Sequence, residues 1–179
     1  MNIRIHQLEK LKDSKTLVIL FRDEFDDSSI GFIVDISEDF ILLEEVDDNG
    51  KLDGIVILRI EDITRVRWEG NELNSLSKLI DLKERIKGLN AIDISNKYYA
   101  LDSVFQKFKH IGIHIEEIDN GVLFIGEIAE IDADTIILHE FGTKSNLDRS
   151  FIMLELEDIT KIQAGGIYEM GLMKIFGKI

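Results

Sequence analysis

Three histidines are the clearest candidates for metal chemistry in this sequence. His110 and His114 are separated by Ile-Gly-Ile, so in an extended strand both imidazoles lie on the same face of a sheet. His139 falls on a strand that we expect to be its neighbour, and Glu130 or Glu140 could add a carboxylate. Such a set can bind zinc. The interpretation we favour is that these are half-exposed strand residues, because the first half of the chain has no equivalent cluster.

Carboxylates are abundant, but their spacing does not define a catalytic pair. Asp132 and Asp134 are predicted in a tight turn, and Asp47-Asp48-Asn49-Gly50 resembles the start of a calcium loop. A calcium loop needs a glutamate at position twelve, where this chain has Leu58. The sequence has no phosphate-binding glycine loop, no Gly-x-Ser-x-Gly elbow and no cysteine nucleophile. We therefore predict that the protein is not an enzyme and has no cofactor.

The acidic charge is concentrated in two blocks. The formal charge is −14; residues 20–63 carry three basic and fourteen acidic groups, and residues 116–160 carry two and twelve. Such blocks attract cationic partners and repel phosphate backbones and anionic membranes. Alternatively, they serve solubility alone. The candidate partner-binding acids lie in loops and turns expected near strand ends: Asp23, Glu24, Asp26, Asp27, Asp47, Asp48, Glu116, Glu117 and Asp119.

Length and composition limit the class of protein. The chain has 179 residues, 45% of them apolar, with neither cysteine nor proline, so it can bury a core but cannot form disulfides or Cys-ligated metal sites. No apolar stretch reaches the roughly 18–20 residues that cross a bilayer. The first residues do not lead into the apolar segment of a signal peptide. We expect a cytoplasmic protein that does not enter membranes.

The sequence contains an internal repeat. The segment 31–46 aligns with 126–141 with seven identical residues in sixteen, and 57–66 aligns with 153–162 with five in ten. Each copy contains five runs of alternating or continuous apolar residues separated by turn residues. Asn49-Gly50 and Asn120-Gly121 are typical hairpin turns, and Gly31 and Gly126 indicate a sharp strand bend. Five short strands in each copy predict a small β-barrel.

Helices are expected to frame the strands. Apolar residues at helical spacing precede each copy, and another set between the copies predicts a helix that ends near Gly88. We expect Trp68 to fill the join between the two copies. The predicted organisation is residues 1–70, a helix with the first barrel; 71–96, a helical linker; 97–166, a helix with the second barrel; and 167–179, an apolar C-terminal tail that packs back on a barrel.

A helix followed by five bent strands with Gly-x-Ile-x-x-Ile-x-x-Asp resembles the Sm-like barrels of the SH3-like class. The pattern is carried by Gly31, Ile33, Ile36 and Asp39, and again by Gly126, Ile128, Ile131 and Asp134. The resemblance implies two tandem barrels, assembly through barrel edges and RNA binding through an Asn after the Asp and a basic-Gly pair. This chain has Leu43 and Leu138 instead of that Asn, and Arg59-Ile60 and Glu155-Leu156 instead of the pair.

The sequence favours a non-catalytic protein that uses acidic loops to bind a basic protein, for example as an inhibitor or immunity protein. Two alternatives remain open. One is a nucleic-acid-binding protein, which the net charge disfavours and which would use Arg65, Arg67, Lys83, Arg85, Lys87, Lys107 and Lys109. The other is a self-assembling structural module, a homo-oligomer formed through barrel edges or the C-terminal tail.

Overall fold

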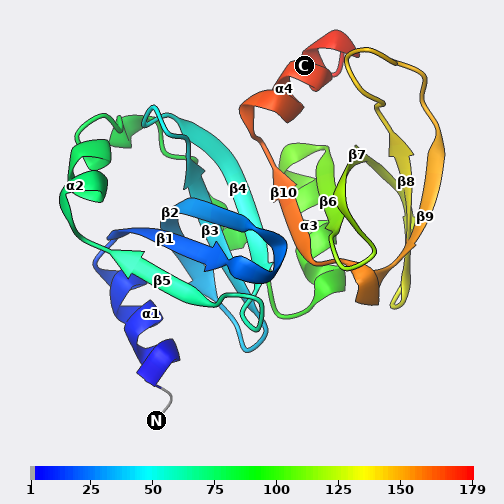
Figure 1. Ribbon diagram of the computed structural model, residues 1–179. Coiled ribbons are helices and arrows are strands. Elements are labelled where there is room, and N and C mark those ends of the chain that lie inside the picture. Colours follow the sequence, from blue (N-terminus) through cyan, green and yellow to red (C-terminus); the bar gives the residue numbers. More distant parts are fainter. Residues whose placement is uncertain (1–2) are drawn as a thin grey trace.

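Ten strands form one continuous antiparallel sheet in the computed structural model, which describes residues 3–179 (Figure 1). The order across the sheet is β5-β1-β2-β3-β4-β10-β6-β7-β8-β9. The strands of the first half are β1 Leu17–Arg22, β2 Asp27–Ile36, β3 Phe40–Val46, β4 Leu52–Arg59 and β5 Arg65–Trp68. Those of the second half are β6 Ile111–Ile115, β7 Asp119–Ile131, β8 Thr135–Glu140, β9 Phe151–Glu155 and β10 Lys161–Ala164.

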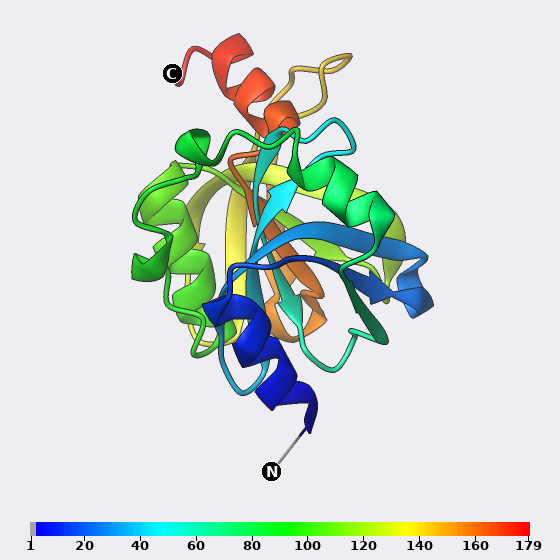
Figure 2. The same ribbon diagram turned by 90° about the vertical axis from the view of Figure 1, so that its left-hand side faces the viewer.

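Helical segments connect and cover the strands. The α-helices are α1 Ile3–Asp13, α2 Asn71–Ser77, α3 Lys97–Phe108 and α4 Ile167–Ile175. Short 3₁₀ turns occur at η1 Asp23–Phe25, η2 Leu82–Glu84, η3 Leu89–Ala91 and η4 Leu156–Asp158. Figure 2 shows α1 and α2 on the side of the first half that faces away from the second half. None of the helices within residues 3–179 has the length and apolarity needed to cross a membrane.

The duplication seen in the sequence is repeated in the strand pairing. The order β5-β1-β2-β3-β4 in the first half is matched by β10-β6-β7-β8-β9 in the second. The pairing of β2 with β3 slips between Ile33 and Asp35, and that of β7 with β8 slips at the equivalent positions, Ile128 and Glu130. Such a bulge bends and twists the strands locally. The two halves are therefore structural as well as sequence repeats.

Close strand contact explains the two glycines of the repeat. A Cβ atom on Gly31 would lie 2.1 Å from the carbonyl oxygen of Glu44, and one on Gly126 would lie 2.5 Å from that of His139. No side chain fits at either distance, so both positions require glycine for space. The close approach of the neighbouring strand thus accounts for both glycines, whereas the sharp strand bend expected at them stays a prediction.

The predicted mainly-β architecture is confirmed, but the prediction of two separate tandem barrels is not supported because the sheet is not closed. Instead, β4 of the first half pairs with β10 of the second, from Ile55↔Ala164 to Leu58↔Lys161. Strands β3 and β4 are apolar on both faces, as buried strands are. When the second half continues the sheet of the first, both apolar faces of β3 and β4 become buried, and the backbone groups at the edge of β4 gain hydrogen-bond partners.

The two faces of β3 and β4 belong to different cores. Ile41 and Val56 lie in the core of the first half, together with Leu8 of α1. On the other face, Leu42 and Ile57 join a core shared with the second half. This shared core also contains buried residues of the connecting segment and of α3: Leu89, Ile92, Ile94, Ala100, Leu101 and Val104. The two halves are thus packed together through the connector.

Two predictions about the connecting segments are wrong. The expected linker helix ends at Ser77, and the chain then runs through η2 and η3. The apolar face assumed for a longer helix does not form, because Ile80 is buried whereas Leu79 and Leu82 are 64% and 61% exposed. Trp68 does not fill the join between the halves. It lies on β5, at the far edge of the sheet, and is 38% exposed.

Of the two predicted Asn-Gly turns, one is confirmed and the other is wrong. Gly50 has a φ of 80° in the turn between β3 and β4, as predicted. Asn120 and Gly121 instead lie in β7, and the turn falls at residues 116–118, where Ile118 N–H donates to the carbonyl of Ile115.

The C-terminal segment packs back as predicted, since Leu172 and Met173 of α4 are buried against Ile125 and Phe141.

The crowding at Gly126 predicts a measurable cost. We expect Gly126→Ala to lower the free energy of unfolding by about 1–3 kcal/mol, because the added methyl group must displace backbone that cannot relax freely. Gly121→Ala, on the same strand, is the matched control: its nearest neighbour would lie 3.7 Å away, and its stability should stay near wild type. Urea unfolding of both variants gives the comparison. Equal stability of the two would contradict the packing explanation.

Candidate binding cleft

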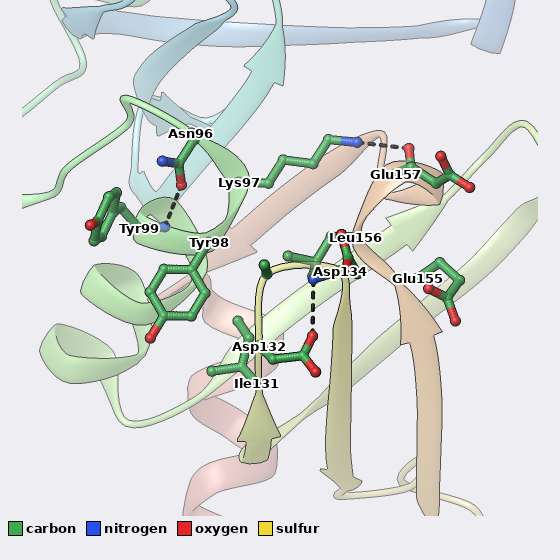
Figure 3. A pocket seen from close by; sticks show the side chains of 11 residues that line it. Asn96, Lys97, Tyr98, Tyr99, Ile131, Asp132, Asp134, Glu155, Leu156 and Glu157 are labelled. Carbon is green, nitrogen blue, oxygen red and sulfur yellow. Dashed lines mark hydrogen bonds between the residues drawn. The ribbon is translucent and has the colours of Figure 1, made fainter.

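A cleft of about 960 Å³ lies on the second half, where three elements meet (Figure 3). Its walls come from the N-terminus of α3, the turn between β7 and β8, and η4 with the end of β9. The residues that line it are Asn96, Lys97, Tyr98, Tyr99, Ile131, Asp132, Ala133, Asp134, Glu155, Leu156 and Glu157. The cleft therefore combines two aromatic rings with four carboxylates.

Local hydrogen bonds hold these elements in place. The Asn96 side chain caps α3 by accepting from Tyr99 N–H at 2.9 Å, which fixes the turn that carries both tyrosines. Leu156 N–H donates to the carbonyl of Asp134 at 2.7 Å and so ties η4 to the turn between β7 and β8. In the first half Ile60 N–H makes the same bond to Asp39 at 2.8 Å. The frame of the cleft is thus part of the repeat.

The four carboxylates of the cleft lack a cationic partner. Asp132, Asp134, Glu155 and Glu157 are exposed, and none forms an ion pair with a basic side chain within residues 3–179. The Asp132 carboxylate accepts from two backbone N–H groups, those of Asp134 and Thr135, which hold the pKa of Asp132 below its ordinary value. This group stays ionised at neutral pH.

Lys97 forms the border of the cleft. Its Nζ donates to the carbonyl oxygen of Glu157 at 2.7 Å, as Figure 3 shows. Burial lowers the pKa of Lys97, and the nearby Arg59 guanidinium lowers it further. The lysine is therefore held by a backbone carbonyl and leaves the carboxylates of the cleft uncompensated.

A second, smaller cleft adjoins the first. It has about 440 Å³ and is lined by Glu38, Asp39, Phe40, Arg59, Ile60, Glu61, Lys97 and Glu157. Its turn and strand end are the repeat counterparts of those in the first cleft, since Asp39 aligns with Asp134 and Glu61 with Glu157. The two clefts share Lys97 and Glu157. Together they form a mainly acidic surface that spans both halves of the chain.

The chemistry of the first cleft suits a cation. Aromatic faces and carboxylates both attract an ammonium or guanidinium group, and a partly enclosed site strengthens that attraction. Leu156 and the half-buried Ile131 supply apolar surface for the aliphatic stem of a long basic side chain.

Among the acids predicted from the loops, several are already paired within the chain. Glu116 and Asp27 contact Arg22, Asp27 also contacts Lys161 at 3.0 Å, and Glu117 contacts Arg59. Except for the pair of Arg22 with Asp27, these ion pairs join the first half to the second. Glu116, Glu117 and Asp27 therefore stabilise the junction between the halves.

The other predicted acids lie apart from the cleft. Asp23 pairs with Arg65, and hydrogen bonds from Arg65 and Thr64 lower the pKa of Asp23 to about 2. Asp47 accepts backbone N–H groups in the turn between β3 and β4, and Asp119, at the start of β7, accepts from Gly121 N–H. The remaining three are exposed on surface loops: Glu24, Asp26 and Asp48. A partner-binding role for these loops stays a prediction.

The structure does not bring the three histidines together. His110 is fully buried; its Nδ1 lies 3.0 Å from the carbonyl oxygen of Phe108, and its Nε2 accepts from Gly165 N–H. His114 is bonded to Gln163, whereas His139 lies on β8, which β7 separates from β6, and stacks on Phe151. Among residues 3–179, no group of three or more potential ligands is placed to hold a metal ion.

Sequence reasoning identified only part of the cleft. Asp132 and Asp134 stood out as a turn, but Tyr98, Glu155 and Glu157 were not singled out. The sequence did hold one indication of these residues: Glu155-Leu156 occupies the position of the basic-Gly pair that the Sm-like resemblance implies, beside the turn that follows Ile131.

A scan against protein-family models and searches of curated proteins and of solved structures each found no match.

The buried ion pair at the junction predicts an acid-sensitive step. Burial acts to raise the pKa of Glu116, but hydrogen bonds from Arg22 and Thr160 outweigh it and bring the pKa below its ordinary value of 4.5. A lowered folded-state pKa stabilises the fold above the unfolded pKa, and this contribution is lost as the pH falls through the folded pKa. The junction should therefore weaken below pH 4.5.

We expect Glu116→Gln to reduce the free energy of unfolding at pH 7 by about 1–3 kcal/mol, because it removes the bidentate carboxylate from the buried Arg22 and leaves Asp27 and the more distant Asp62 to neutralise the guanidinium. The difference from wild type should shrink as the pH falls below 4.5, since the wild-type carboxylate is then also neutralised. Chemical denaturation at several pH values measures this. Glu24→Gln, on an exposed acid, is the control, and parallel curves for wild type and Glu116→Gln would contradict the assignment.

Proposed function

We propose that this protein is a non-catalytic binding protein that engages a basic protein partner through the acidic cleft at the N-terminus of α3. The observation that carries the proposal is the set of four unpaired carboxylates around Tyr98, in a chain where many other acids have internal partners. A lysine or arginine side chain of the partner would enter beside Tyr98. Its charge would then be compensated by the carboxylates that line the cleft.

The wider surface supports a partner larger than a single side chain. The adjoining cleft adds Glu38, Asp39 and Glu61 next to the first, so several cations could bind along one face. The formal charge of −14 would steer a basic protein towards this face. An inhibitor or immunity protein that blocks a cationic toxin is a concrete form of this function, because blocking requires affinity and charge complementarity but no chemistry.

Nucleic-acid binding is less well supported. Of the basic residues suggested for it, Arg65, Arg67 and Arg85 pair with acids, and Lys107 Nζ donates to the carbonyl oxygen of Lys87. The clefts at the loops where the Sm-like resemblance would place RNA are each lined by four carboxylates, which repel phosphate. We keep RNA binding as an outcome of the test below.

The cleft can be tested with an oligolysine peptide and a fourfold variant, Asp132→Asn, Asp134→Asn, Glu155→Gln and Glu157→Gln. These changes keep side-chain size and the turn acceptor of Asp132 while removing four charges. We expect calorimetric titration at low salt to show affinity lower by about tenfold or more, since each surface pair contributes up to about 1 kcal/mol. Wild-type binding should weaken steeply with added salt.

The matched control removes four charges from the loops: Glu24→Gln, Asp26→Asn, Asp48→Asn and Asp119→Asn. It should retain most of the wild-type affinity. An equal loss in both variants would mean that the peptide responds to net charge alone, and a larger loss in the loop variant would move the site to the loops. Tight binding of single-stranded RNA in a parallel titration would favour the nucleic-acid alternative.

A further inference from the structure

A basic pocket lies on the first half of a chain whose formal charge is −14. It has about 480 Å³ and lies between the end of α1, strands β2 and β3, and the segment from η2 to η3. None of the described residues that line it also lines either acidic cleft. Five of its lining residues are cations: Lys12, Lys15, Lys83, Arg85 and Lys87.

A buried carboxylate fixes the position of Arg85. Glu44 is fully buried, and it accepts from Arg85 Nε at 2.6 Å and from Ile86 N–H at 2.7 Å. The guanidinium also lies over the ring of Phe32, 4.6 Å from its centroid. A guanidinium has five N–H donors, and the four on Nη1 and Nη2 make no hydrogen bond within residues 3–179. These four donors are available to an anion at a fixed position.

Three lysines of the pocket have no partner in the part of the chain that the structure describes. Lys15, Lys83 and Lys87 are exposed, and their ammonium groups form neither an ion pair nor a hydrogen bond there. Glu44 is the one acid among the described lining residues, and its charge is already compensated by Arg85. The charges of the three lysines are therefore uncompensated.

We propose that this pocket binds a small anion that carries two or three linked phosphate groups. Phosphate oxygens accept hydrogen bonds from the planar fork of an arginine, and lysines neutralise phosphate as point charges. A linked di- or triphosphate carries several negative charges in a compact volume, so it can contact Arg85 and the unpaired lysines together. The volume of the pocket lies within the range of small-molecule sites. This inference is independent of the acidic cleft.

Acids around the pocket limit the size of the ligand. Lys12 pairs with Glu9 at 2.7 Å and lies 3.7 Å from Asp35. Asp81 and Glu84 are exposed on the segment that begins η2. A phosphate chain that continued beyond the pocket would pass these carboxylates, which repel it. A compact anion contacts the cations without extending over the acids, so the pocket favours a small ligand over a nucleic-acid strand.

Apolar side chains next to the cations allow two sources of the phosphates. Val34 and Ile86 line the pocket half-buried, and Leu82 lines it 61% exposed. An organic molecule that carries the phosphates could bury this apolar surface, whereas an inorganic oligophosphate would use the cations alone. The two sources share the same phosphate chemistry and differ in whether they contact these apolar residues.

The first probe is sodium tripolyphosphate, titrated into the full chain by calorimetry at low salt without divalent cations. We expect one molecule to bind per chain, with an affinity that falls as salt is added. The triple variant Lys15→Gln, Lys83→Gln and Lys87→Gln should bind about tenfold more weakly or worse, since three exposed charge contacts are lost. Because these lysines are exposed, the variant should unfold at the same urea concentration as wild type.

The matched control removes three exposed lysines outside the pocket: Lys51→Gln, Lys144→Gln and Lys174→Gln. It should retain most of the wild-type affinity for tripolyphosphate. A further variant, Arg85→Lys, keeps the charge beside Glu44 but loses the planar fork, so its affinity should fall several-fold. Unchanged affinity in Arg85→Lys would contradict the role assigned to Arg85.

A nucleoside triphosphate, titrated in parallel, distinguishes the two sources. Tighter binding than tripolyphosphate would support a phosphorylated organic ligand, and equal affinity would support an inorganic one. Three results would overturn the proposal: no binding of either probe, an equal loss in the pocket and control variants, or single-stranded RNA that binds more tightly than both probes and depends on the same three lysines.

Discussion

The pairing of β4 with β10 is the interaction on which the rest of this structure depends. A β-strand with two apolar faces cannot stay at a sheet edge, because its backbone groups and its side chains would both face water. In this chain β10 satisfies the backbone of β4, and α3 with the connecting segment covers the outer face of β3 and β4. The repeat thus forms one sheet with two cores and a shared interior between them.

The ion pairs beside this junction have a different role from the apolar contacts. Arg22 is fully buried and binds both Glu116 of the second half and Asp27 of the first. A buried ion pair adds little net stability compared with apolar packing, but removing one partner is costly. Its contribution is best understood as specificity: it fixes how the two halves are positioned, in a region where apolar contacts alone would allow slippage.

The fixed junction also determines which turns and clefts lie next to each other on the surface of the molecule. It brings the turn at Asp39 and the turn at Asp134 to neighbouring places, so the two clefts lie side by side and share Lys97 and Glu157. A single repeat would present one small cleft. Two repeats in a fixed relation present one extended acidic surface.

The sequence by itself determined the local features of this protein. The strands were predictable because alternation and turn residues act over a few neighbours. The requirement for glycine at positions 31 and 126 is also local, because crowding against the next strand excludes any side chain. The burial of the apolar C-terminal segment was also predictable, since an apolar segment must be covered. The turn that contains Asp132 and Asp134 was predictable as well, because turn residues act on their near neighbours along the chain.

Only the tertiary structure decided how these pieces combine. Whether β4 closes a barrel or pairs with β10 depends on competition between distant partners with similar local patterns, and so does the position of Trp68. The loop acids were expected at the surface, but contacts across 94 residues, as between Arg22 and Glu116, turned several of them into junction residues. Tyr98 and Glu155 meet in one cleft for the same reason: their proximity is set by long-range packing, which spacing along the chain does not encode.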